Sequence, residues 1–428
     1  MANMKFSLTN FIILLFTSIQ FCYAQKGKKP QVLVYGTDIS AYTAALQSAK
    51  SGVPTVWVAD NDTLLPALST KRVQIEQDSN LDGGIWLDVL MHMAQSNTVN
   101  DSLARYIKRD MNPRLFLNAI DAQLAKNANL TVVRNQKVQA IKANSKGWQV
   151  TLAGKQRYDL RAVIDASETQ ELFKLLPQNY RPKGSALSSA KHLNAGKHRT
   201  LIATGVIADT RYALTLADAL SMQEDGFFSL NIGQSSDRAD IRFTAARAAI
   251  GQAIGATAAY LAFFKTTPDK IDVRKLQSEL MTYGMRIMPY QDIAVQDPNF
   301  FAIQRFGLAG IIPGVYENDM YLFEGDERVR YGEIQPTLNR LFSRSQLWFA
   351  DHQSEFFKWE DFLSLVKFVG LRGDEVDKGV QREWKTKLKF DGDFDKTKYV
   401  TRYQFAVVLD LYASPYVKSV NQQGEFVN

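Results

Sequence analysis

Residues 36 to 60 hold the side chains whose types and spacing point most directly to chemistry, namely the binding of a dinucleotide's phosphates. Gly36 ends a continuous apolar run, Val32 to Tyr35, which is typical of a strand buried on both faces. Helix formers follow as far as Gly52, and a second apolar run, Thr55 to Val58, ends at Asp60. This order of strand, turn, helix and strand predicts a βαβ unit, in which a pyrophosphate binds at the amino terminus of the helix.

The glycine fingerprint inside this frame is incomplete. The pattern G-x-G-x-x-G would fall on Gly36, Asp38 and Ala41, so only the first glycine is present. A carboxylate near two phosphates is unfavourable, whereas an aspartate here is a good cap for the helix. The acidic residue that grips the ribose is expected at position 59, where Ala59 stands and Asp60 follows. The frame predicts a dinucleotide-type fold and leaves open whether a dinucleotide binds.

Two later stretches bear on the same chemistry. Residues 159–166, DLRAVIDA, form a buried-type strand that ends at Ser167. Residues 240–264, DIRFTAARAAIGQAIGATAAYLAFF, are helical in composition and place Gly251 and Gly255 on one face. A glycine inside a helix costs about 1 kcal/mol relative to alanine, so each needs a reason. Tight packing and a cofactor explain this spacing equally well.

In this order, the stretches resemble the FAD-dependent oxidoreductases of the two-dinucleotide-binding-domain type, and among them exported bacterial members with a C-terminal helical extension. The resemblance covers residues 31–264 and implies FAD as the cofactor. It implies contacts with the cofactor at Gly36, Thr37, Asp38, Ser40, Ala41, Asp60, Val138, Asp165, Ala166, Ser167, Gly251, Gln252 and Gly255. Arg242 is the single candidate beside the flavin ring, and it is equally a structural arginine. No general base, nucleophile or metal set is indicated.

The amino terminus has the features of an export signal. Lys5 precedes the apolar run Phe11 to Ile19, and Cys22-Tyr23-Ala24 is typical of a cleavage site. We therefore expect residues 1–24 to be a signal peptide, with an uncleaved anchor as the alternative, and the mature protein to be periplasmic or secreted. Because Cys22 is the only cysteine, the mature chain would have neither disulfides nor thiolate metal sites. No later run is long and apolar enough to form a stable membrane span.

Several further features favour ordinary structural roles. The net charge of +7 is spread along the chain, which favours a solvated surface over a nucleic-acid interface. His192 and His198 lie in the polar segment 177–200 and are interpreted as surface histidines. Gly83-Gly84 is interpreted as a turn before a helix, with a backbone approach to a cofactor as the alternative. Short alternating runs between residues 130 and 152 predict a small antiparallel sheet.

The C-terminal third changes character, with fewer glycines and more aromatic residues on helical spacing. Gly310 and Gly370 are 60 residues apart and Glu333 and Gln404 are 71 apart, which fits two copies with an insertion in the charged loop 374–398. The layout resembles S-layer homology repeats, and Val400-Thr401-Arg402 fits the segment that contacts cell-wall polysaccharide in that family. Packing within the protein is favoured over binding of such an envelope polymer.

The sequence thus predicts an α/β protein, with an FAD/NAD(P)-binding Rossmann-like domain at residues 25–265. All-α repeats are expected at residues 266–345 and 346–428. The predicted function is an exported FAD-dependent oxidoreductase acting on a small molecule or a glycan. The alternative is a non-catalytic envelope-binding or scaffold protein on a degenerate flavoprotein fold.

Overall fold

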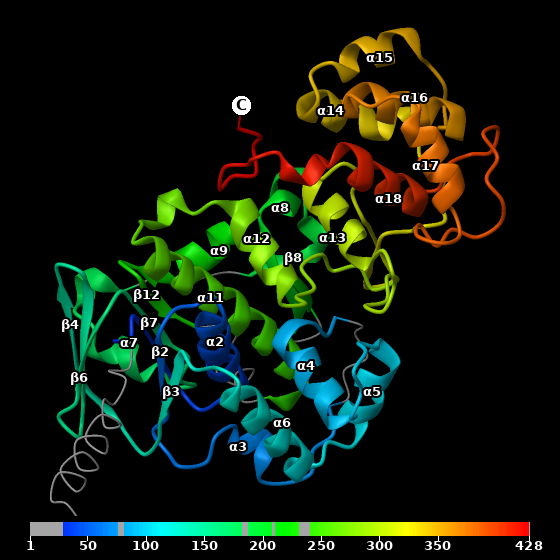
Figure 1. The fold of residues 1–428 in the computed structure, drawn as a ribbon. Helices are drawn as coiled ribbons and strands as arrows, with labels where there is room; N and C mark the ends of the chain where they lie inside the picture. Colours follow the sequence, from blue (N-terminus) through cyan, green and yellow to red (C-terminus); the bar gives the residue numbers. More distant parts are fainter. Residues whose placement is uncertain (1–28, 76–80, 182–186, 208–209, 231–239, 428) are drawn as a thin grey trace, which may run out of the picture.

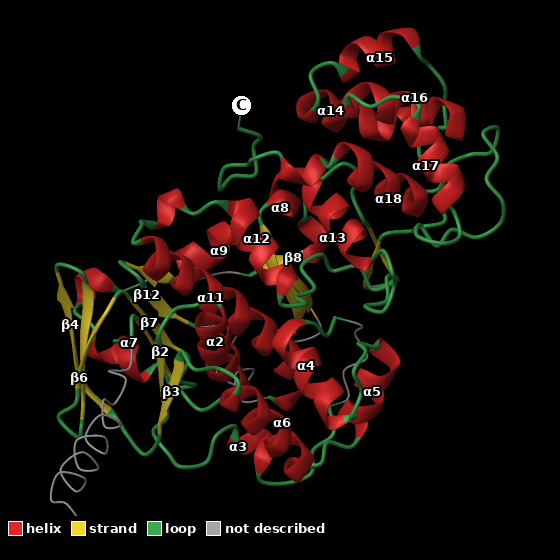
Figure 2. Ribbon diagram, viewed as in Figure 1, coloured by secondary structure: helices red, strands yellow, loops and turns green. Residues whose placement is uncertain are grey.

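A computed structural model describes residues 29–75, 81–181, 187–207, 210–230 and 240–427. The predicted signal peptide, residues 1–24, lies outside the described residues. The centre of the molecule is a six-stranded sheet in the order β11-β12-β7-β1-β2-β3, parallel except for β11 (Figures 1 and 2). Its strands are β1 (Val32–Tyr35), β2 (Thr55–Val58), β3 (Leu130–Val133), β7 (Ala162–Asp165), β11 (Gln223–Glu224) and β12 (Phe227–Ser229).

The predicted βαβ unit is confirmed in β1, α2 (Ile39–Lys50) and β2. Every residue of both strands is buried, because the sheet is covered on both faces. Val32 and Val34 point into the core shared with the helices, whereas Leu33 and Tyr35 point into the core on the opposite face. This alternation explains why the run lacks polar residues.

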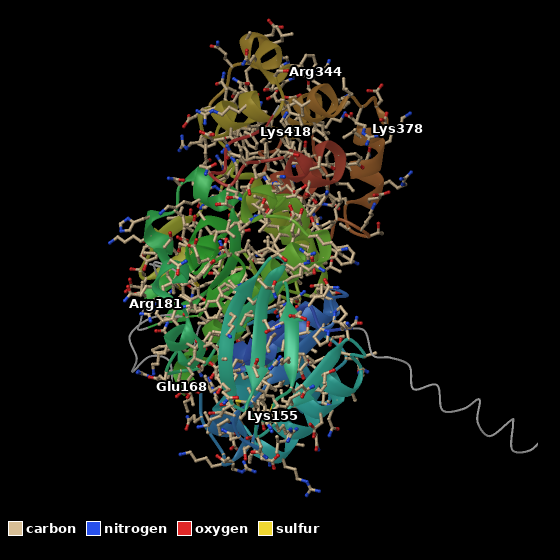
Figure 3. All side chains as sticks on the ribbon, turned by 90° about the vertical axis from the view of Figure 1, so that its left-hand side faces the viewer. Lys155, Glu168, Arg181, Arg344, Lys378 and Lys418 are labelled. Carbon is tan, nitrogen blue, oxygen red and sulfur yellow. The ribbon has the colours of Figure 1, made fainter. Side chains whose placement is uncertain are left out.

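The face of Leu33 and Tyr35 is covered by a three-stranded antiparallel sheet, which the sequence predicted in part. The first predicted strand, residues 130–133, is instead β3, which pairs in parallel with β2 in the central sheet. Its strands are β4 (Val138–Asn144), β5 (Gly147–Leu152) and β6 (Arg157–Leu160). The prediction of one strand over residues 159–166 is wrong, because the chain passes at Arg161 from β6 into β7 and so from one sheet to the other. In Figure 3 the antiparallel sheet faces the viewer, with the exposed Lys155 at its lower end.

The opposite face of the parallel sheet is covered by helices. α2 packs along α11 (Thr244–Phe264), and the two run side by side across the molecule (Figure 1). A Cβ atom at Gly251 would collide with the backbone of Ser40, and one at Gly255 with the backbone of Ala44. The two glycines therefore permit close helix-to-helix contact. The neighbouring helices on this face are α3 (Pro66–Ser69), α4 (Gly84–Met93), α5 (Asp101–Arg109) and α6 (Pro113–Ala125). The short helix α7 (Glu171–Leu175) lies on the other face, against β4 and β7.

Residues 187–230 contain a second antiparallel sheet that the sequence did not predict, in the order β8-β10-β9. The elements are β8 (Ser188–Ser189), α8 (Ala195–Arg199), β9 (Leu201–Ile207), β10 (Thr210–Thr215) and α9 (Leu216–Ser221). The interpretation of His198 as a surface histidine is wrong. Its side chain is buried, its Nε2 lies 2.6 Å from the Tyr321 hydroxyl, and burial lowers its pKa to about 4. His192 is exposed, as expected.

The C-terminal third is mostly helical and forms the upper part of Figure 1. Its elements are α12 (Val273–Thr282), α13 (Phe300–Ala309), β13 (Val315–Glu317), β14 (Met320–Leu322), α14 (Tyr331–Leu341), α15 (Ser345–Asp351), α16 (Trp359–Gly370), α17 (Glu375–Glu383) and α18 (Arg402–Ala413). Gly310 ends α13 in the left-handed conformation, as predicted, but α16 continues through Gly370 and Leu371 takes that conformation instead. α17 lies within residues 374–398, where the sequence predicted an insertion.

Three extended segments, each leading into a helix, meet in this region. Backbone bridges join Arg328 to Thr401, Arg330 to Phe356, and Lys358 to Tyr399. The helices that follow are α14, α16 and α18, so the start of α16 matches the two helix starts that the sequence singled out.

Glu333 and Arg402, which belong to the two predicted repeats, contact each other across this junction. The Arg402 guanidinium donates to Glu333 at 2.8 Å, and Thr401 and Gln404 form a capping box at α18. The contact between Arg402 and Glu333 joins the start of α18 to the start of α14.

Candidate functional site

The carboxyl edge of the parallel sheet brings together most residues that the sequence singled out. Tyr35 lies opposite Val58 and Asp165 in the parallel register, so the chain leaves β1, β2 and β7 at the same edge. Ala59 accepts the Gln136 N–H at 3.1 Å, which places the start of β4, and with it Val138, near this edge. In parallel α/β sheets, ligands bind at such an edge.

Gly36 makes the tight turn that the βαβ frame requires. Its φ is +138°, which favours glycine, and a Cβ atom there would lie 2.8 Å from the carbonyl oxygen of Ala166. The indole of Trp57 donates to the Gly36 carbonyl at 2.8 Å and fixes its direction. The first position of the fingerprint therefore has the role expected for it.

Asp38 caps α2, in agreement with the structural role considered for it. One carboxylate oxygen accepts the Ala41 N–H at 2.9 Å, and the other accepts the Ser40 hydroxyl at 2.6 Å. These bonds satisfy one of the free N–H groups of the helix terminus and hold a negative charge against its dipole. A carboxylate of the protein thus lies beside the position where this fold places a phosphate.

Arg247, which the sequence analysis did not single out, faces Asp38 from α11. The guanidinium Nη1 lies 3.5 Å from an Asp38 carboxylate oxygen, and the Arg247 side chain is 8% exposed. Its Nε and Nη1 have no hydrogen-bond partner among the residues that the structure describes. A buried guanidinium with free donors is costly unless an anion accepts from it. Its position therefore indicates a second anion at this helix terminus.

A signal in the sequence would have found Arg247. It is the only charged residue within α11, and it lies four positions before Gly251 and eight before Gly255. Spacing by four puts all three on the helix face that contacts α2. A single charge on an otherwise small and apolar contact face needs a partner, and here that partner is Asp38.

Asp165 shapes the corner that follows β7. One oxygen accepts the N–H and hydroxyl of Ser167, at 3.1 and 2.5 Å, and the other accepts the Phe173 N–H at 2.8 Å. Burial raises the pKa of Asp165, and these hydrogen bonds oppose the rise. The corner lies directly against Gly36, so Asp165, Ala166 and Ser167 set the shape of the turn.

Thr37 and Asp60 also lie at the carboxyl edge. The Thr37 carbonyl accepts the Leu65 N–H at 2.9 Å, which binds the loop after β2 to the glycine turn. Asp60 is partly exposed at the end of β2. Burial and then the Glu171 carboxylate raise the pKa of Tyr35, and the charge of Asp60 adds to this rise.

Three predicted site residues lie apart from this cluster. Gln252 is buried, donates to Gln47 at 2.9 Å and accepts the Ile85 N–H at 3.0 Å, so it joins α11 to α2 and α4. Gly255 packs deeper along α2. Arg242 is exposed and pairs with Asp240 at 2.6 Å.

Gly83 precedes α4 and Gly84 begins it. A Cβ atom would meet Arg286 at Gly83 and Gln252 at Gly84, so packing requires both glycines. Within the described ranges, no three His, Cys, Asp or Glu side chains gather as a metal site.

Comparison with known proteins agrees with this geometry. A model of the family described as FAD dependent oxidoreductase matches residues 31–181, which is less than half of the chain. The match contains the glycine turn, the corner after β7, the strands β1, β2, β3 and β7 of the parallel sheet, and the whole β4-β5-β6 sheet. It points to FAD as the cofactor and supports a redox function. No curated protein matches the chain.

Solved structures resemble only part of the chain. Bacillithiol disulfide reductase Bdr (YpdA) from Staphylococcus aureus is 14% identical over 32% of this chain and 38% of its own, with a TM-score of 0.24. Tetracycline destructase Tet(51) is 14% identical over 38% of this chain and 44% of its own, with a TM-score of 0.25. Thioredoxin reductase from Lactococcus lactis is 12% identical over 32% of this chain and 35% of its own, with a TM-score of 0.22. The match spans less than half of each of these proteins.

Proposed function

We propose that this chain is an exported flavoprotein oxidoreductase that binds FAD at the carboxyl edge of its parallel sheet. The observation that carries the proposal is the buried Arg247 guanidinium, which faces the amino terminus of α2 and whose Nε and Nη1 make no hydrogen bond to any described residue. The family match over residues 31–181 supports the same cofactor.

The residues present fit the pyrophosphate of FAD. Gly36 lets the chain turn closely against Ala166, and the amino terminus of α2 supplies N–H groups and the positive end of its dipole. Arg247 would donate to a phosphate oxygen from the opposite side. Asp38 keeps the helix capped, and Arg247 partly offsets its negative charge.

FAD would supply the redox chemistry when bound, and the protein would supply position and electrostatics. In this proposal Thr37, Asp60 and Val138 would hold the adenosine half of the cofactor. Asp165 to Ser167 would meet the rest of it, together with Arg242, which lies in the turn just before α11. We propose a small molecule or a glycan as the substrate.

Export is part of the proposal and rests on the sequence of residues 1–24. Among the described residues, no helix combines the length and apolar character needed to cross a bilayer. We therefore propose that the mature chain acts in the periplasm or outside the cell. Residues 25–265 would form the cofactor domain, and residues 266–345 and 346–428 two repeat units.

A second candidate function is a non-catalytic envelope or scaffold protein on the same fold. The observation that favours it is Asp38, whose carboxylate already occupies donors at the α2 terminus. An envelope polymer would then bind the C-terminal repeats. The exposed Tyr399 and Arg328, whose guanidinium lies 4.4 Å from the tyrosine ring, offer a surface for it.

One experiment separates the two candidates. The mature protein is purified and its visible absorbance is recorded before and after denaturation. Flavin absorbance that is released intact on denaturation supports the oxidoreductase. A colourless protein that gains no thermal stability from excess FAD would rule out the first candidate and leave the second.

A further inference from the structure

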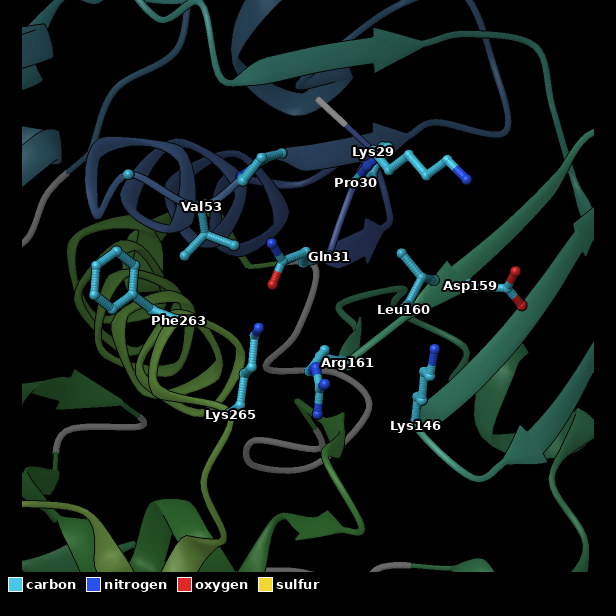
Figure 4. Close-up of a pocket in the computed structure, with 12 residues that line it drawn as sticks. Lys29, Pro30, Gln31, Val53, Lys146, Asp159, Leu160, Arg161, Phe263 and Lys265 are labelled. Carbon is cyan, nitrogen blue, oxygen red and sulfur yellow. The ribbon is translucent and has the colours of Figure 1, made fainter. Parts of the chain in front are cut away.

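The amino edge of the parallel sheet, opposite the proposed cofactor site, contains a hollow of about 640 Å³. It opens where β1 and β2 begin: the Gln31 N–H bonds to the Pro54 carbonyl at 2.7 Å, and the Arg161 N–H bonds to the Gln31 carbonyl at 2.8 Å. The end of α11 forms another wall, so the hollow lies at the far end of the same helix that carries Arg247 (Figure 4).

Four cationic side chains line this hollow, which we call the basic hollow: Lys29, Lys146, Arg161 and Lys265. They come from four different parts of the chain and surround one opening (Figure 4). In the part of the chain that the structure describes, none of the four has an ion-pair partner. The only acid in the lining, Asp159, accepts a hydrogen bond from the Gln149 amide at 3.0 Å.

Two adjacent aromatic side chains stand beside the basic hollow. Phe263 and Phe264, the last residues of α11, are 59% and 53% exposed, and their ring centroids are 5.0 Å apart. α11 is buried as far as Ala262, and Lys265 then ends it in the left-handed conformation. Burial of a phenylalanine side chain is worth about 1.5–3 kcal/mol, so two exposed neighbours indicate a surface that meets an apolar partner.

We propose that this edge docks on an anionic phospholipid surface, with headgroup phosphates in the basic hollow and Phe263 and Phe264 at the level of the headgroups. Aromatic residues favour the membrane interface, and each lysine or arginine near an anionic bilayer contributes about 1 kcal/mol. The proposal does not rest on FAD binding, because the basic hollow lies at the other edge of the sheet.

The choice of occupant follows from the charges and the aromatic side chains at this edge. A second copy of this chain would bring cations against cations, since the chain carries a net charge of +7 and the basic hollow has one acid. A small soluble anion would account for the cations and leave the phenylalanine pair without a role.

Vesicle co-sedimentation of the mature chain tests the proposal. One set of vesicles contains phosphatidylcholine alone, and the other contains phosphatidylcholine mixed with phosphatidylglycerol. We expect binding to the anionic vesicles only, with loss at high salt. The double variants Lys146→Glu/Lys265→Glu and Phe263→Ser/Phe264→Ser should each lower the partition coefficient by roughly tenfold or more. Circular dichroism and the melting temperature check that both remain folded.

Matched controls change the same kinds of side chain elsewhere. Lys191→Glu/Lys378→Glu reverses two exposed lysines, and Leu347→Ser/Val417→Ser removes apolar side chains that are 67% and 73% exposed. Lys378 lies among the C-terminal helices, far from the antiparallel sheet (Figure 3). Both controls should bind vesicles as the wild type does.

Results of three kinds would overturn the proposal. One kind comes from the vesicles: either equal binding by all four variants, or no binding to anionic vesicles at all. Another is a dimer in solution that Phe263→Ser/Phe264→Ser dissociates, which would assign this edge to a second copy. The third is complete displacement by glycerol phosphate together with no effect of the phenylalanine variant, which would identify a site for a soluble anion.

Discussion

The two ends of the α2–α11 helix pair treat charge differently. At the carboxyl edge, Asp38 and Arg247 face each other in a buried position, with little exposure and with donors left over. At the amino edge, Lys29, Lys146, Arg161 and Lys265 surround an open hollow and have no acidic partner in the described structure. A buried, partly neutralised pair suits one small, well-positioned anion, whereas exposed cations suit a diffuse anionic surface. The two roles that we propose, binding of a pyrophosphate and docking on an anionic surface, thus lie at opposite ends of the same helices.

The largest expected effect comes from breaking the glycine turn at one edge only. Gly36→Ala should destabilise the protein by about 3 kcal/mol or more, because the φ of +138° is unfavourable for alanine and the new Cβ atom would meet the Ala166 carbonyl. Gly52→Ala, at the other end of α2, should cost about 1 kcal/mol, since its φ is +80° but no atom lies within 4 Å. Urea unfolding of the two variants measures the difference. Equal losses would mean that contact with Ala166 does not constrain the turn.

The next effect concerns the two arginines. Arg247→Met should weaken FAD binding by roughly ten- to a hundredfold, because a hydrogen bond to a charged group is worth about 1.5–3 kcal/mol. Arg161→Met, at the amino edge, should leave FAD binding unchanged. Fluorescence titration with FAD measures both affinities. If Arg247→Met binds FAD as the wild type does, the guanidinium serves Asp38 alone.

A smaller and opposite effect is expected at Asp38. Asp38→Asn keeps a good helix cap and removes the negative charge, so FAD should bind roughly tenfold more tightly, or by about 1.4 kcal/mol. Without FAD the same variant should melt at a lower temperature, because Arg247 loses its counter-charge. Asp395→Asn is the matched control, since Asp395 also accepts a backbone N–H, from Thr397, in an exposed loop. Weaker FAD binding by Asp38→Asn would mean that the carboxylate does not face the phosphates.

The sequence predicted the backbone of the cofactor region better than its charges. The apolar runs and the glycine at position 36 specify β1, α2 and β2, because both strand faces are buried and the turn tolerates no Cβ atom. The face shared by Gly251 and Gly255 indicated close contact, and the structure identifies α2 as the partner. Arg247 escaped notice because its partner lies about 200 residues away in the chain.

The regions that the sequence missed depend on contacts between distant segments. β9 and β10 are buried strands for which the sequence analysis made no prediction, and they follow the polar segment 177–200 directly. His198 was interpreted as a surface residue because its neighbours in sequence are polar. It is buried, and its ring contacts Tyr321, which lies more than a hundred residues away in the chain.

The most direct test of the central claim is thermal unfolding of the mature chain with FAD and, separately, with riboflavin, which lacks the pyrophosphate. We expect FAD at a hundred times its Kd to stabilise the protein by about 2.7 kcal/mol, and riboflavin to have little effect. The increment should shrink in Arg247→Met. Equal stabilisation by the two compounds, or none by FAD, would contradict a pyrophosphate site at the amino terminus of α2.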